Sequence, residues 1–166
     1  IDEHERHNAI HGYGKRAFWK LVSLKEDAVT LSWRAPNMEG YPFDIVVTAT
    51  YSLADDGLHL NISAYNNGDA DAPWALAIHP WLANGFNGYG DEIDAHNAKC
   101  SLTVPGRTHV TVNENLIPTG TEPVDGTKYD LRKDTLLTEQ PFDDAWTDLE
   151  HAEDGTVTAV FTRPDG

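Results

Sequence analysis

The segment 43-FDIVVTATYSLADDGLHLNISAYN-66 decides the fold class of this chain. Apolar and polar positions alternate along residues 43–53 and again along residues 58–66, which is the pattern of strands with one buried face. Between them lies Ala54-Asp55-Asp56-Gly57, and an Asp-Gly pair between two alternating runs is among the stronger local signals for a β-hairpin. The segment therefore predicts two antiparallel strands joined by a tight turn.

The other apolar runs are also short and rich in β-branched and aromatic residues, which favours strands over helices. Residues 17–25 and 28–33 predict a further hairpin, and the continuous apolarity of residues 74–79 predicts a short strand buried on both faces. The glycine-rich residues 83–100 have no clear period and are expected to form a long functional loop. Further strands are expected at residues 100–104, 108–112 and 156–162. We therefore expect an all-β fold, a sandwich of antiparallel strands.

Length and ends bear on the domain organisation. A chain of 166 residues with 40% hydrophobic residues can form one ordinary domain with its own core, so we expect a single domain over residues 1–166. The sequence opens at Ile1 and stops soon after a strand-like run. From this we expect the natural protein to be longer and the domain to be incomplete at both termini.

Charge and cysteine content limit the partners. The chain has 12 Lys and Arg against 27 Asp and Glu, and the net charge of −15 repels phosphate backbones and anionic lipids. We therefore expect neither nucleic acid nor a membrane as partner, and the sequence shows no apolar run of about 18 residues and no signal-peptide pattern. The single cysteine, Cys100, allows no internal disulfide and is compatible with a reducing cytoplasm, where we expect the protein.

The segment 4-HERHNAIH-11 could be taken for a metal site, because its histidines would share one face of a helix. However, glycines follow at positions 12 and 14, and neither cysteine partners nor a downstream carboxylate is present. A polar loop with exposed histidines is the better interpretation, and we expect no metal.

His79, in 72-APWALAIHPW-81, is a candidate general acid. A residue before proline favours extended backbone, so Pro80 would fix the end of a strand and the direction of the His79 ring. A histidine can donate and recover a proton near neutral pH. The alternative is a partly buried histidine that only ends the strand, and this stretch alone slightly favours that alternative.

Two adjacent carboxylates, Asp143 and Asp144, precede Trp146 in 140-QPFDDAWTDL-149. Only one of them can face a given side if the stretch is extended. A carboxylate beside an indole is suited to a sugar, because the acid accepts hydroxyl hydrogen bonds while the ring covers an apolar face. An acidic surface turn is the alternative.

Four segments, in this order, resemble the aldose 1-epimerase (galactose mutarotase) family: 8-NAIHG-12, 72-APWALAIHPW-81, 116-LIPTG-120 with 125-DGTKYDLR-132, and 142-FDDAW-146. The resemblance spans nearly the whole chain. It implies a large antiparallel β-sandwich that binds a free aldohexose such as galactose or glucose. It also implies an isomerase that interconverts the α and β anomers without a metal or organic cofactor.

The resemblance also implies roles for three residues. His79 has the place of the His-Pro histidine, which acts as general acid on the ring oxygen of the sugar. Substrate binding is implied for His11, the His-Gly histidine, and for Asp143, three residues before an aromatic residue. Ring opening requires a proton to reach the ring oxygen while another leaves the C1 hydroxyl, after which the aldehyde rotates and closes on its other face.

Two family features cannot be placed: an Asn-Arg pair shortly before the His-Gly motif, and a glutamate general base near the C-terminus. Glu139, Glu150 and Glu153 do not lie in a matching context. Since a general base contributes about 10²–10⁴ in rate, we expect turnover by these residues alone to be strongly reduced.

Three other functions stay open. A non-catalytic carbohydrate-binding β-sandwich would need no titrating histidine, and a structural sandwich derived from an ancestral mutarotase would need no site. A hexose-phosphate epimerase relative would need a basic cluster, for which Lys15 and Arg16 are the nearby candidates, and the charge of −15 argues against it. The preferred sugar and the oligomeric state are not evident from the sequence.

Overall fold

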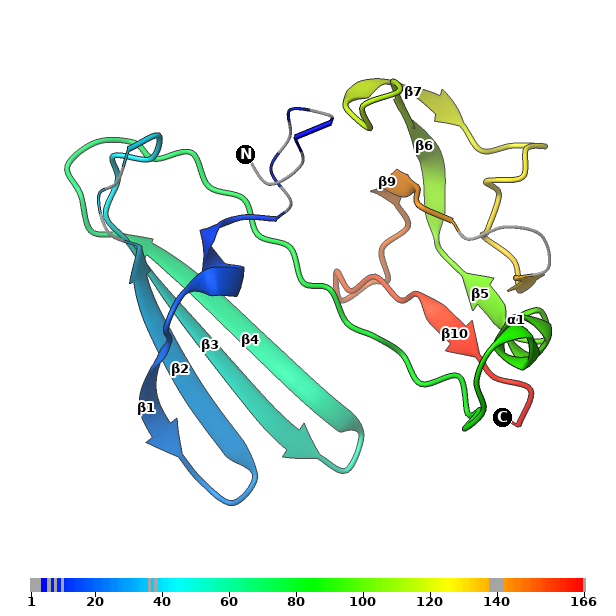
Figure 1. Cartoon of the computed structure of the whole chain (residues 1–166), viewed down its shortest axis with the longest axis horizontal. Coiled ribbons are helices and arrows are strands. Elements are labelled where there is room, and N and C mark those ends of the chain that lie inside the picture. The colour runs from blue at the N-terminus through cyan, green and yellow to red at the C-terminus, as the bar shows by residue number, and fades with distance from the viewer. Residues whose placement is uncertain are drawn as a thin grey trace. The chain divides into compact units, whose positions relative to one another are not determined.

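A computed structural model of the chain describes residues 4–5, 7, 9, 11–35, 37, 39–137 and 142–165 (Figure 1). The chain forms two compact units, Ile1–Ile78 and His79–Gly166. All strand pairs in the described residues are antiparallel, and one short α-helix is present among them. The all-β prediction is thereby confirmed. Within the same residues, no helix has the length and apolarity that crossing a membrane requires.

The first unit is a four-stranded sheet in which each strand pairs with the next along the chain. A 3-10 helix, η1 (Tyr13–Arg16), comes first, and the strands are β1 (Lys20–Leu24), β2 (Ala28–Ala35), β3 (Ile45–Ala54) and β4 (Gly57–Asn66). Ala54 pairs with Gly57, so Asp55 and Asp56 alone make the turn. Gly57 has a φ of 132°, a conformation that side chains disfavour. Both predicted hairpins are confirmed.

The core of this unit lies on one face of the sheet. Along β3, Ile45, Val47 and Ala49 are buried and alternate with half-buried residues. Cross-strand pairing places Trp33 opposite Val47 and Ala35 opposite Ile45, so their side chains share this face. Partly buried hydrophobic residues complete the cluster: Trp19, Trp33, Tyr41, Phe43, Ile62 and Ala72.

The second unit contains two three-stranded sheets, with strand orders β10-β5-β8 and β7-β6-β9. Its elements are α1 (Asp91–Asn97), β5 (Ser101–Thr103), β6 (Gly106–Val112), β7 (Pro118–Pro123), β8 (Thr135–Leu136), β9 (Ala145–Leu149) and β10 (Val160–Thr162). The strands expected at residues 100–104 and 108–112 are confirmed. The strand expected at 156–162 is shorter, because only its last three residues pair with β5.

Two sequence predictions are wrong. Residues 74–79 form no strand, and Trp74, Leu76 and Ile78 are 43–60% exposed. Although their composition favours a strand, none of the described residues pairs with them, and a strand exists only through its partner. Residues 83–100 are not a loop throughout, because they include α1. Asp91, Glu92 and Asp94 in the first turn favour this helix through the helix dipole.

Candidate functional site

His79 is exposed and lies outside any strand. Its ring is tilted against that of Trp81, with 6.1 Å between the ring centroids. The predicted presentation from the end of a rigid strand is therefore wrong. The following Pro80 favours extended backbone at His79.

His11 lies just before η1, and its side chain is exposed. Its φ is 61°, in the left-handed region that non-glycine residues enter at a cost and that is enriched at functional sites. His7 has a φ of 56°, so no right-handed helix runs through both and aligns their rings. Asn8 and Ile10 of the same motif lie outside the described residues.

Asp143 lines a hollow of about 230 Å³ on the sheet β7-β6-β9. Pockets that bind drug-sized ligands have volumes of roughly 300–1,000 Å³. The hollow is smaller than these and is suited to a smaller ligand. Its wall consists of Val110, Val112, Leu116, Pro118, Asp143, Asp144 and Ala145, so His79 is not among the described residues that line it. A larger hollow of about 500 Å³, lined by Leu82, Ala83, Ala159, Phe161, Thr162 and Arg163, contains none of the predicted site residues.

The turn between β6 and β7 forms part of the wall of the hollow beside Asp143. Asn113 Oδ1 accepts hydrogen bonds from the backbone N–H groups of Asn115 and Ile117, both at 3.0 Å. Leu116 between them has a φ of 60° and lines the hollow. The segment 116-LIPTG-120 is therefore the end of a turn followed by the start of β7.

The two aspartates differ in what they contact. Ala145 pairs with Val110, and Trp146 pairs with His109, so the hollow and His109 belong to opposite faces of the sheet. Both aspartates contribute to the wall of the hollow, but only Asp144 also contacts His109: its Oδ1 lies 2.9 Å from His109 Nε2. The other ring nitrogen, Nδ1, lies 3.0 Å from Glu122 Oε1. We call Asp144, His109 and Glu122 the His109 bridge.

Aromatic residues enclose the histidine of the bridge. The rings of His109 and Tyr129 are stacked, with 3.6 Å between centroids and 9° between planes. The backbone carbonyl of Tyr129 accepts a hydrogen bond from Trp146 Nε1 at 2.9 Å. His109 is 5% exposed as a result. Carboxylates thus approach its two nitrogens while aromatic rings cover its surface.

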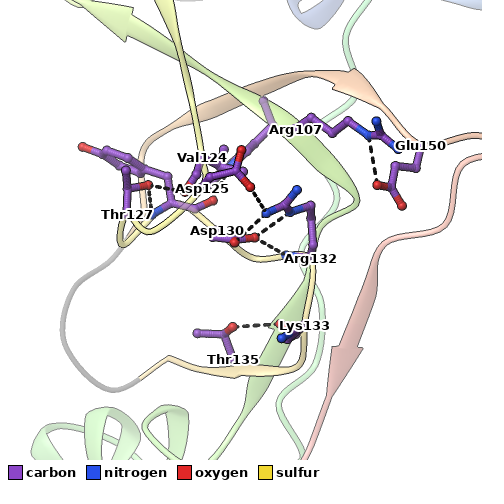
Figure 2. Close-up of polar contacts among 11 residues, drawn as sticks. Arg107, Val124, Asp125, Thr127, Asp130, Arg132, Lys133, Thr135 and Glu150 are labelled. Carbon is purple, nitrogen blue, oxygen red and sulfur yellow. Dashed lines mark hydrogen bonds and ion pairs between the residues drawn. The ribbon is translucent and has the colours of Figure 1, made fainter.

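The loop that carries Tyr129 is held by Arg132 (Figure 2). The guanidinium donates two hydrogen bonds of 2.7 Å to Asp130 and one of 2.7 Å to Asp125. The contact with Arg132 lowers the pKa of Asp130 below its ordinary value. Next to this cluster, Val124 and Leu131 are fully buried. The motif 125-DGTKYDLR-132 therefore has a structural role, which is to order the loop behind His109.

Sequence reasoning missed His109, Glu122 and Tyr129. The alternation along 106-GRTHVTV-112 places His109 on the face opposite Val110 and Val112, which was the available signal. The two carboxylates lie on opposite sides of the imidazole and so do not converge on one point. Among the described residues, nowhere do three His, Cys, Asp or Glu side chains gather as metal ligands would.

A family model described as aldose 1-epimerase matches residues 2–165. The chain belongs to the aldose 1-epimerase family. Galactose mutarotases of Rattus norvegicus and Homo sapiens are 33% and 34% identical to it over 135 and 138 residues, in each case 78% of this chain and 37% of the relative. The Escherichia coli protein YihR is 39% identical over 83 residues, which are 49% of this chain and 27% of that protein.

The fold is also similar to a solved structure of the family. The GalM/aldose epimerase homologue from C. elegans matches with a TM-score of 0.57 and 20% sequence identity. The match covers 88% of this chain and 45% of that one. The chain thus has a galactose mutarotase-like all-β fold, and it spans less than half the length of these relatives.

Proposed function

We propose that the chain acts on a free aldohexose, such as galactose or glucose, and interconverts its α and β anomers. The observation that carries the proposal is membership of the aldose 1-epimerase family over residues 2–165. The relatives named galactose mutarotase support a sugar as the substrate. The hollow beside Asp143 supports a small ligand.

The proposed reaction uses three residues. His79, exposed and next to Trp81, protonates the ring oxygen, and the proton of the C1 hydroxyl leaves to a base that the proposal does not assign. Asp143 accepts a hydrogen bond from a sugar hydroxyl, a bond strengthened by the carboxylate charge. His11 contacts the sugar near its ring oxygen. No metal or organic cofactor takes part in these steps.

We also propose that the protein forms a single functional domain and works in the cytoplasm. Its only cysteine, Cys100, is buried, which is compatible with a reducing compartment. The charge of −15 supports a neutral small molecule, and not nucleic acid or an anionic membrane, as the partner.

Polarimetry tests the reaction. Freshly dissolved α-D-galactose and α-D-glucose are followed to equilibrium with the chain, with its His79→Asn variant and with buffer alone. We expect the chain to accelerate the change in rotation and the variant to lose about 10²–10⁴ of that acceleration. A variant as active as the unchanged chain would contradict the role of His79.

A second candidate is a non-catalytic carbohydrate-binding protein. The observation that favours it is that His79 does not line the hollow beside Asp143 in the described residues. Such a protein would bind galactose without accelerating anomerisation, and His79→Asn would not change its affinity. Sugar binding measured by nuclear magnetic resonance (NMR) titration, together with polarimetry, therefore separates the two functions.

A further inference from the structure

The His109 bridge places a buried histidine between two acidic side chains. His109 has 6% of its side chain exposed, whereas Glu122 and Asp144 have 46% and 23% exposed. The carboxylates therefore remain partly hydrated, whereas the ring between them is not. Both distances to the ring, 2.9 and 3.0 Å, are those of direct hydrogen bonds.

The positions of the two acids determine how the His109 ring can form hydrogen bonds. The two ring nitrogens are the polar atoms of His109, and each lies within hydrogen-bond distance of one acid. The ring therefore joins two acids from opposite points, and the ring of Tyr129 stacks on it with 3.6 Å between the centroids. Neither an amide nor a hydroxyl side chain can donate from two such opposite points.

The bridge ends at Asp144, which is adjacent in sequence to Asp143, the proposed sugar-binding residue. Glu122 and Trp146 are the cross-strand partners of His109 in β7 and β9, so the histidine lies in the middle strand of the sheet. Asp144 lies just before β9, outside the ladder of strand hydrogen bonds, and its contact with His109 fixes it to that sheet. Asp144 also belongs to the wall of the hollow, but its carboxylate contacts His109, and alternation along an extended segment then directs the neighbouring Asp143 to the hollow side.

We propose that His109 is a positioning residue, which holds Asp143 at the hollow through Asp144. The role in sugar recognition rests on the proposed function, whereas the positioning of Asp143 does not. Without the bridge, residues 143–144 lose their fixed orientation and sugar affinity falls. The proton transfer at His79 is not part of this role.

The test compares backbone order at Asp143 in three variants of the full chain. His109→Gln can donate toward one carboxylate only, and Asp144→Ala removes the bridge while His109 still contacts Glu122 and Tyr129. His151→Gln is the matched control, because His151 is an exposed histidine that contacts the backbone of Gly155. NMR relaxation gives the order parameter of the amides at 143 and 144, and titration with galactose gives the affinity.

We expect order parameters near about 0.85 in the unchanged chain and the control, and below about 0.6 in both bridge variants. Galactose affinity should fall about tenfold in both, as for a lost hydrogen bond to a charged group. The double variant should be no worse than either single one, because both remove the same interaction. In turnover, KM should rise with kcat retained, whereas general destabilisation would lower the active fraction and so kcat.

Unchanged order at residues 143–144 in Asp144→Ala would overturn the proposal, even if His109→Gln unfolds the chain. A fall in order in both variants, in a chain that binds no sugar at all, would support the positioning role and contradict the proposed function. Failure of the positioning role and failure of the proposed function therefore give different results.

Discussion

Gly106 determines how closely Trp146 packs on β6. A Cβ atom added at Gly106 would lie 2.6 Å from Trp146 Cβ and 3.0 Å from its Cδ1. Because a Cβ atom cannot rotate away, β6 and β9 would have to move apart. Trp146 in turn contacts the Tyr129 carbonyl, so this glycine affects the packing around His109.

Gly106→Ala should therefore lower the free energy of unfolding by about 1–3 kcal/mol, the usual cost of overpacking. Urea unfolding followed by tryptophan fluorescence measures it. Gly12→Ala is the control, because a Cβ atom there meets nothing within 4 Å. Equal stability of the two variants would show that Gly106 does not restrict Trp146.

Single residues also show which features of the site could be predicted from the sequence and which could not. Asp143 could be predicted to differ from Asp144, because alternation separates neighbours onto two faces. His109 could not be matched to its partners, because these depend on which strands flank β6. Glu122 and Asp144 are 13 and 35 residues from His109 along the chain, and no local pattern specifies that register.

At the scale of elements, the β6–β7 turn depends on one side chain. Asn113 Oδ1 accepts two backbone hydrogen bonds that hold Leu116 in its left-handed conformation beside the hollow. Asn113→Ala should cost about 1–2 kcal/mol of stability, measured as a lower urea midpoint, because two hydrogen bonds are lost. Asn113→Asp keeps the acceptor and should stay close to the unchanged chain. An alanine variant of full stability would contradict this role.

The ends of β2, β3 and β4 are joined through Asp44. Arg34 Nε donates to Asp44 Oδ1 at 2.6 Å, its Nη2 donates to Oδ2, and Asn67 Nδ2 donates to Oδ2 at 2.9 Å. The hydrogen bond from Arg34, followed by that from Asn67, lowers the pKa of Asp44 from 3.8 to about 2. The ionised form is therefore favoured in the folded state.

A lowered folded-state pKa contributes stability that is complete above the unfolded pKa and is lost as pH falls through the folded one. The contribution of Asp44 should thus be complete above pH 3.8 and decline toward pH 2. Asp44→Asn should be less stable than the unchanged chain at neutral pH, with the difference shrinking over this window. Arg34→Gln should show the same loss of stability at neutral pH and the same shrinking difference as the pH falls. Urea midpoints between pH 6 and pH 2 measure this, and a constant difference would contradict it.

Elements that neighbouring residues specify could be predicted from the sequence, and elements that depend on pairing with distant segments could not. The β3–β4 hairpin has alternation on both arms and a glycine at its turn, so its register follows from neighbouring residues. Residues 74–79 have strand composition and no strand among the described residues beside them. β7 and β9 have little apolar alternation, and their pairing with β6 is what defines them.

At the scale of the whole molecule, the proposed residues belong to both units: His11 to Ile1–Ile78, and His79 and Asp143 to His79–Gly166. The second unit supplies the hollow, the His109 bridge and the proposed acid. The proposed anomerisation, measured on the entire chain, therefore tests these residues together.

Exchange NMR on an equilibrium mixture of galactose anomers measures that property most directly, because cross-peaks between the α and β anomeric protons report the rate of interconversion. We expect the chain to produce exchange beyond that in buffer, and His79→Asn to abolish the increase while galactose still binds. A chain that binds galactose without increasing the exchange, or a His79→Asn variant that increases it equally, would contradict the proposed reaction.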